Sequence, residues 1–235
     1  MKIGILRILC GLMIFVLISN DTSAQSADEL IRQVKEKLMR VKDYKARAVL
    51  KTDVSFIRIP QSDVDVYFKR PDKFKIKKEG GISIFPKGGA SMNLNSLLAN
   101  DKFAAVSGGD ATLAGSPVKI VKLLPLDETT EVVLTTLYID KDMLIRKATT
   151  TTRDNGTYQM DMEYGRFGSW GLPDKVIFTF NTKSYSLPKG MTLEYEGGAK
   201  PPPPDKSTKE QKGRIEVSYS GYVINKGIAD DTFKN

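Results

Sequence analysis

The chain has 235 residues, of which 40% are hydrophobic, and it carries a formal charge of +8 with no histidine. Its single cysteine is Cys10, so the rest of the chain offers neither Cys nor His. These absences exclude Ser-His-Asp and Cys-His nucleophilic sites and argue against ordinary zinc sites and disulfides. A chain of this length is able to bury one sizeable core, so stability must come from packing.

Residues 1–24 have the composition of a signal peptide. A basic start precedes an apolar core at 8–18 that is too short to span a bilayer, and small residues end at Ala24. We therefore expect export and cleavage after Ala24, with a retained anchor as the alternative. The residues before Cys10 lack the small side chain of a lipidation site, so we expect no lipid there.

Removal of these residues leaves a formal charge of +7. Export argues against a nucleic-acid partner, whereas the positive charge is compatible with contact to anionic lipid headgroups. The alternative is a solvated, self-repelling surface that keeps sheet edges from aggregating. Within 73–77, lysines alternate with apolar residues, so Lys73, Lys75 and Lys77 are predicted on one exposed strand face, where they would steer the protein to an acidic partner or to anionic headgroups.

Residues 27–44 show the spacing of an amphipathic helix, with Ser26 or Asp28 as its cap. The apolar residues at helical spacing are Ile31, Val34, Leu38 and Val41. A helix this amphipathic needs an apolar surface to lie on, and the apolar face of a sheet is the obvious one.

The first half of the chain then predicts strands at 46–59, 64–69 and 73–77, with Val66 and Phe68 on an alternating apolar face. A short helix at 91–100 is weakly indicated, and 103–115 is small and Gly-rich. A further strand is expected at 117–124.

The clearest pattern lies in residues 132–181, which predict four antiparallel strands in a meander. Apolar residues alternate with polar ones over 157–164, and an Asn-Gly pair before them favours a type I′ hairpin with 149–152. The residues of the resulting apolar face are Tyr158, Met160, Met162, Tyr164, Val176, Phe178 and Phe180. Two interpretations stay open: a plain packed core, or the lining of a hollow, because methionine adapts to variable ligands.

The last part of the chain contains a Pro-rich stretch at 197–213, predicted as an exposed loop, and a strand that restarts at Ile215. About ten strands are expected, without a repeat or a domain boundary, so residues 25–235 are predicted to form one domain. Because helices do not alternate with strands, the class is α+β, mainly β, with an antiparallel sheet.

Five features then combine in a recognisable order after an amphipathic helix and a long strand. They are YFKRPDKF (67–74), LYID (137–140), the Asn-Gly hairpin (155–156), GLP (171–173) and NKGIADDTF (225–233). In order and spacing they resemble the LolA-type periplasmic carriers of outer-membrane lipoproteins, over nearly all of the chain after residue 24.

This resemblance implies a strongly curved, incompletely closed antiparallel β-barrel, covered by an N-terminal lid helix and one or two short helices. It also implies a hollow for acyl chains between sheet and lid. The expected lining is Tyr158, Met160, Met162, Tyr164, Phe178, Phe180, Val66, Phe68, Ile31, Val34 and Leu38. Arg70 matches a family arginine that hydrogen-bonds the lid backbone in the closed state.

The resemblance implies a monomeric periplasmic carrier of lipoprotein acyl chains or another lipid, loaded and unloaded by transient inner- and outer-membrane proteins. An envelope sensor of the same fold, binding a lipid or a protein, is the alternative. The Pro-rich stretch departs from the pattern of the short carriers. Two alternatives therefore stay open: a general lipoprotein shuttle, or a paralogue specialised for one cargo. No cofactor or metal is expected, and an enzyme is disfavoured because no paired-carboxylate, phosphate-loop or metal-ligand motif occurs.

Overall fold

The computed structural model describes residues 26–53, 61–78, 85–86, 98, 102–127, 129–154, 156–181, 191–192 and 212–234. Its helices are α1 (Ala27–Met39) and the short 3-10 helices η2 (Gly168–Trp170) and η3 (Asp230–Phe233). Its strands are β1 (Asp43–Asp53), β2 (Ser62–Lys69), β3 (Lys73–Lys78), β4 (Phe85–Pro86), β5 (Phe103–Leu113), β6 (Ser116–Pro125), β7 (Val132–Asp140), β8 (Ile145–Thr152), β9 (Thr157–Glu163), β10 (Lys175–Asn181), β11 (Met191–Thr192) and β12 (Lys212–Ile224).

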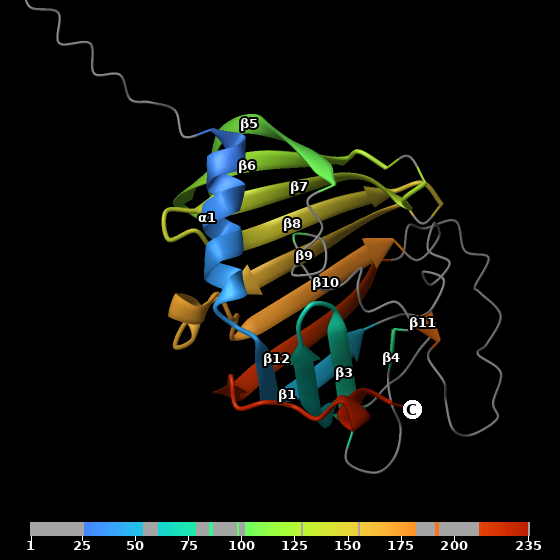
Figure 1. Ribbon diagram of the computed structural model, residues 1–235. Coiled ribbons are helices and arrows are strands. Elements are labelled where there is room, and N and C mark those ends of the chain that lie inside the picture. Colours follow the sequence, from blue (N-terminus) through green and yellow to red (C-terminus); the bar gives the residue numbers. More distant parts are fainter. Residues whose placement is uncertain are drawn as a thin grey trace, which may run out of the picture.

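Ten of these strands form one antiparallel sheet in the order β3-β2-β1-β12-β10-β9-β8-β7-β6-β5. The edge strands β3 and β5 do not pair with each other, so the sheet stays open. Strand direction turns strongly from β5 to β3, and α1 crosses one face of the β5–β9 part (Figure 1). The expected curved, incompletely closed antiparallel architecture with a helical cover is therefore confirmed; β4 and β11 form a separate small pair.

Helix α1 begins where the sequence indicates. The side chain of Ser26 accepts a hydrogen bond from Glu29 N at 3.1 Å, and two acidic residues occupy the first turn. The helix ends at Met39, five residues before the expected end, because the chain turns into β1 at Asp43. Val41 therefore lies in the connection and not on the helix, where it is 2% exposed.

The meander predicted for residues 132–181 is present as β7, β8, β9 and β10, each paired with the next. The type I′ turn expected at Asn-Gly is wrong: Thr151 pairs with Thr157 and Thr152 N donates to Gly156 O, so the β8–β9 connection is longer than two residues, with Gly156 at φ +69°. The Gly-rich stretch 103–115, which suggested no element, contains the long edge strand β5. It is a strand because its neighbour β6 pairs with it along its length, despite the small side chains.

Several expectations lie outside the described residues. They are the signal peptide at 1–24, the strand end at 54–59 and most of the Pro-rich stretch at 197–213. Of the short helix expected at 91–100, only Leu98 is described; it is helical and 2% exposed.

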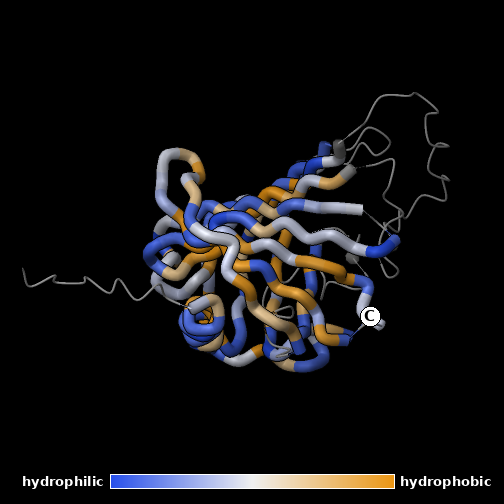
Figure 2. The backbone as a smooth tube through the Cα atoms, turned by 90° about the horizontal axis from the view of Figure 1, so that it is seen from above, coloured by the Kyte–Doolittle hydropathy of each residue, from blue (hydrophilic) through white to orange (hydrophobic). Residues whose placement is uncertain are grey.

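Two groups of buried apolar side chains line one face of the large sheet. The α1 cluster joins Ala27, Leu30, Ile31 and Val34 of the helix to apolar residues of β6 to β10. The tyrosine cluster joins residues of β1 and β2 to Tyr219, Tyr222 and their neighbours on β12. Ile215 packs against both and pairs across the sheet with Phe178, so the two clusters share a face. Figure 2, which looks along α1, shows hydrophobic and hydrophilic residues alternating along the strands.

Candidate functional site

Part of the α1 cluster is built from two neighbouring strands, β9 and β10, whose alternating residues stand opposite one another. Met162 pairs with Val176, Met160 with Phe178 and Tyr158 with Phe180. The rings of Tyr158 and Phe178 lie 5.2 Å apart, and those of Phe178 and Phe180 lie 5.3 Å apart. Cross-strand contact between residues on one face gives this part of the sheet a continuous apolar surface.

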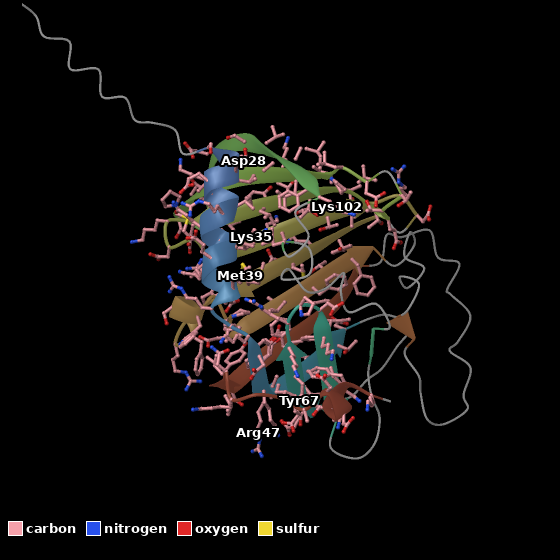
Figure 3. The ribbon with its side chains drawn as sticks, in the orientation of Figure 1. Asp28, Lys35, Met39, Arg47, Tyr67 and Lys102 are labelled. Atoms are coloured by element: carbon pink, nitrogen blue, oxygen red, sulfur yellow. The ribbon has the colours of Figure 1, made fainter. Side chains whose placement is uncertain are left out.

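The helix packs into the same cluster from the β5 and β6 side and crosses the strands near one of their ends (Figure 1). Leu30, Ile31 and Val34 are 3%, 3% and 1% exposed and pack in the α1 cluster, while Leu38 is half-buried at its margin. Asp28, Lys35 and Met39 mark the start, middle and end of α1 in Figure 3. The structure thus brings the expected lid residues together with the aromatic and methionine residues of β9 and β10.

The structure separates two other expected lining residues from this group. Val66 and Phe68 are fully buried, but they belong to the tyrosine cluster. They do not join the α1 cluster, because β1 and β12 stand between β2 and β10 in the sheet. Sequence alternation identified their buried face correctly and could not specify which part of that face they occupy.

The α1 cluster also includes residues that the site prediction missed. Val121 and Leu123 on β6 and Leu137 and Ile139 on β7 are each at most 1% exposed. Their period-2 spacing is a usable signal, although it gives no position relative to the helix. Leu98 joins the cluster without any such signal.

A polar corner beside the cluster shapes the β7–β8 turn. Asp140, 7% exposed, accepts hydrogen bonds from the backbone N–H groups of Asp142 and Leu144 and from Arg146 Nε. The Arg146 guanidinium lies over the ring of Tyr164, whose hydroxyl donates to Ile145 O at 3.0 Å. Burial raises the pKa of Tyr164, so this hydroxyl stays protonated as a donor.

Three hydrogen bonds hold the C-terminal end of α1 to this frame. Lys37 Nζ donates to Asp142 O, Arg70 Nη1 donates to Met39 O at 2.6 Å, and Asn225 Nδ2 donates to Arg40 O at 2.8 Å. Backbone carbonyls at a helix end lack partners within the helix, and cations near them are favourable. The helix is therefore attached by polar groups at its end and by apolar packing along its first turns.

The tyrosine cluster contains the more polar core. Tyr222 donates to Pro173 O at 2.6 Å and its ring lies close to those of Tyr44, Phe167 and Tyr219. Burial raises the pKa of Tyr44, Tyr219 and Tyr222. These hydroxyls stay neutral, so they act as hydrogen-bond groups and not as acids.

The expectation of three exposed lysines on β3 is wrong for Lys75. Its side chain is 7% exposed, its Nζ donates to Lys234 O, and desolvation lowers its pKa. Lys73 pairs with Asp230 at 2.9 Å, which also binds Lys69 at 2.7 Å. The C-terminal segment with η3 covers this strand face, a tertiary contact that alternation along β3 does not encode.

Neither a metal-binding group of acidic, His or Cys residues nor a helix suited to crossing a membrane occurs among the described residues. No protein-family model and no curated protein sequence matches the chain. Solved structures do match. A LolA superfamily protein from Nitrosomonas europaea superposes with a TM-score of 0.56 at 11% identity, over 89% of this chain and 98% of that one.

Two further structures give the same result. A domain assigned to an outer membrane lipoprotein-sorting protein from Vibrio parahaemolyticus superposes with a TM-score of 0.52 at 9% identity, over 88% of this chain and 95% of that one. A DUF1329 family protein from Desulfovibrio piger superposes with a TM-score of 0.53 at 11% identity, over 89% of this chain and 98% of that one. The chain has the LolA-like fold.

Proposed function

We propose that this protein is a monomeric periplasmic carrier that binds lipoprotein acyl chains, or a related lipid, between the sheet and α1. The observation that carries the proposal is the arrangement of the α1 cluster: one amphipathic helix packs its apolar side into a single cluster with the sheet face and is tied by hydrogen bonds at its C-terminal end. The LolA-like fold supports it by analogy of architecture.

The free energy gained by burying the apolar side chains of α1 is comparable to that gained by burying an acyl chain. Burial of Leu30, Ile31 and Val34 together contributes roughly 5–9 kcal/mol, at about 1.5–3 kcal/mol for each side chain. An acyl chain of about fifteen methylenes gains roughly 12 kcal/mol in any apolar site. A chain that displaces the helix therefore replaces its contacts without a large net cost.

The aromatic and methionine residues of β9 and β10 in the α1 cluster suit a ligand of variable shape, such as an acyl chain. Met160 and Met162 have flexible, polarisable side chains, and Tyr158, Phe178 and Phe180 provide flat apolar surface. We propose these five, together with Ile31, Val34, Leu38 and Tyr164, as the binding surface. Val66 and Phe68 would support it from the tyrosine cluster.

Arg70 would act as the lid latch in this carrier. Its bond to Met39 O closes the helix end in the empty form, and cargo that lifts the helix would break it. A hydrogen bond from a charged donor contributes about 1.5–3 kcal/mol, which is enough to bias release towards an acceptor.

Native mass spectrometry of the mature protein, purified from its own periplasm, tests the proposal. Co-purified lipid or lipoprotein, or uptake of an added fatty-acyl probe, is the expected result. Consistently empty protein that takes up no probe would contradict the carrier and favour a partner-binding sensor of the same fold. The same spectra report the mass of the mature chain, and hence whether cleavage follows Ala24.

A further inference from the structure

We propose that one rim of the sheet docks on an anionic bilayer surface, with Trp170 and Met39 entering the headgroup region. This rim, the α1 rim, consists of the segments at the strand ends where α1 joins β1. They are 40–42, 70–72, 114–115, 141–144, 164–174 and 225–229. All six segments are described, so their charges are fully accounted for.

The α1 rim carries an excess of positive charge. Its segments contain six basic residues and three aspartates. The basic ones are Arg40, Lys42, Arg70, Lys141, Arg166 and Lys226. All are exposed except Arg70, which is half-buried. Basic residues close to an anionic membrane each add to its attraction, so this end of the molecule is the one that such a surface would orient.

These cations differ from those on β3 in their partners. Within the described residues, none of the six forms an ion pair. On β3 and its neighbour, by contrast, Lys69 and Lys73 share Asp230, and Lys75 is buried. The cations of the α1 rim are therefore free to attract an outside partner. At the β3 edge, by contrast, most of the positive charge is paired with Asp230 or buried.

Two large apolar side chains stand exposed among the rim cations. Met39, the last residue of α1, is 55% exposed, and Trp170, the last residue of η2, is 38% exposed. Tryptophan and basic side chains are the residues that favour the membrane–water interface. Exposed Trp and Met inside a cationic ring fit a lipid surface better than they fit water.

The fold holds Trp170 in this position. Gly171, at φ +70°, follows it and approaches the last helical turn so closely that a Cβ there would lie 3.2 Å from Leu38 Cδ2. Phe167, three residues before Trp170, packs its ring 5.0 Å from Tyr222. Trp170 is thus presented between the half-buried ring of Phe167 and the end of α1.

Docking by the α1 rim would place the C-terminal end of α1 and the hydrogen bond from Arg70 at the membrane. The benefit of this placement for cargo exchange rests on the proposed carrier function. The docking itself needs no cargo. It is therefore measurable on empty protein, separately from acyl-chain uptake.

Trp170 is the only tryptophan in the chain, so its fluorescence reports on the rim alone. The experiment titrates the mature protein with vesicles of phosphatidylcholine, with and without phosphatidylglycerol. We expect a blue shift of Trp170 emission, and quenching by lipids brominated near the headgroup, only with the anionic vesicles. Added salt should reverse both, because the attraction is screened.

The test variant combines K42E, K141E and K226E, and the control combines K51E, K102E and K122E, which are exposed lysines elsewhere. The rim variant should partition about a hundredfold more weakly or worse, while the control, with equal net charge, should lose much less. Equal losses in both variants, or no blue shift, would overturn the docking surface. Binding only to vesicles that contain membrane proteins would also overturn it, in favour of a protein partner. Acyl-probe uptake by the same variants should be unchanged, and failure of uptake alone would contradict the carrier and not the docking.

Discussion

The α1 cluster and the tyrosine cluster line the same face of one sheet, but they are enclosed in different ways. Over β5 to β9 the cover is a helix of thirteen residues, held by apolar packing along its length and by hydrogen bonds at its C-terminal end. In the tyrosine cluster, the rings of Tyr44, Phe68 and Tyr222 pack together with centroids 5.2–5.3 Å apart, and Tyr222 is also hydrogen-bonded to the backbone. Under the proposed carrier function, one half would exchange its cover for a ligand, while the other forms a fixed core. The difference teaches that burial alone does not distinguish a binding surface from a scaffold.

The largest expected effect comes from removing the helical cover. The double substitution V34D and L38D places carboxylates against the α1 cluster, where an unpaired charge is very costly. We expect loss of acyl-probe binding, measured by fluorescence titration, with retention of the near-ultraviolet signal of the buried tyrosines. M39D provides the control, because this residue is exposed on the same helix. Normal probe binding by the double variant would mean that α1 is not the lid.

Paired core truncations compare the rigidity of the two clusters. Phe68→Ala should lower the free energy of unfolding by about 3–5 kcal/mol, because its fixed surroundings cannot close the cavity. Phe178→Ala, at 2% exposure, should cost less, because the α1 cluster includes a movable helix and the flexible side chains of Met160 and Met162, which can partly close the cavity. Urea denaturation measures both. If Phe178→Ala costs as much as Phe68→Ala, the two halves are equally rigid and the contrast fails.

Replacing the latch should produce a smaller effect, seen in hand-over more than in uptake. Arg70→Leu removes the bond to Met39 O, worth about 1.5–3 kcal/mol, and with it the bias towards the closed, empty form. The variant should hold cargo and transfer it to acceptor membranes roughly ten- to a hundredfold more slowly. A two-step assay separates uptake from transfer. Arg70→Lys is the control variant, because it keeps the charge and shortens the donor side chain. If Arg70→Leu transfers cargo at the wild-type rate, Arg70 is only a surface residue and not a latch.

The smallest expected effect concerns acid and the covered edge of the sheet, far from the helix. Hydrogen bonds from Lys69 and Lys73 lower the pKa of Asp230 to about 2. Because this pKa lies below its unfolded value near 3.8, the stabilisation is complete above about pH 4 and is lost as pH falls towards 2.

The protection of β3 and η3 amides against hydrogen exchange, taken relative to the intrinsic amide rate at each pH, should therefore fall between pH 4 and 2, while the protection of amides in the α1 cluster does not. Asp230→Asn provides the matched control, since its protection at this edge should be nearly independent of pH over this range. An equal fall in that variant would show that other carboxylates control the edge.

Much of the architecture is determined by the sequence alone. Alternation of Tyr158, Met160 and Met162 requires a strand with one buried face, and Asn-Gly before it predicts a hairpin with β8, although not the length of its turn. Helical spacing at Ile31 and Val34 predicts the side that α1 buries. These patterns suffice because they depend on backbone periodicity, which is local.

Tertiary structure decided where each patterned element lies and which charges remain free. Val66 and Phe68 are buried as expected, but strand order places them with Tyr44 and not beneath α1. Lys75 has the sequence context of an exposed residue and is buried by a C-terminal segment more than 150 positions away. Trp170 and Met39 meet the rim cations only because strand connections distant in sequence end at one rim. Periodicity specifies the face of an element, whereas partners are set by which long-range pairings the whole chain satisfies together.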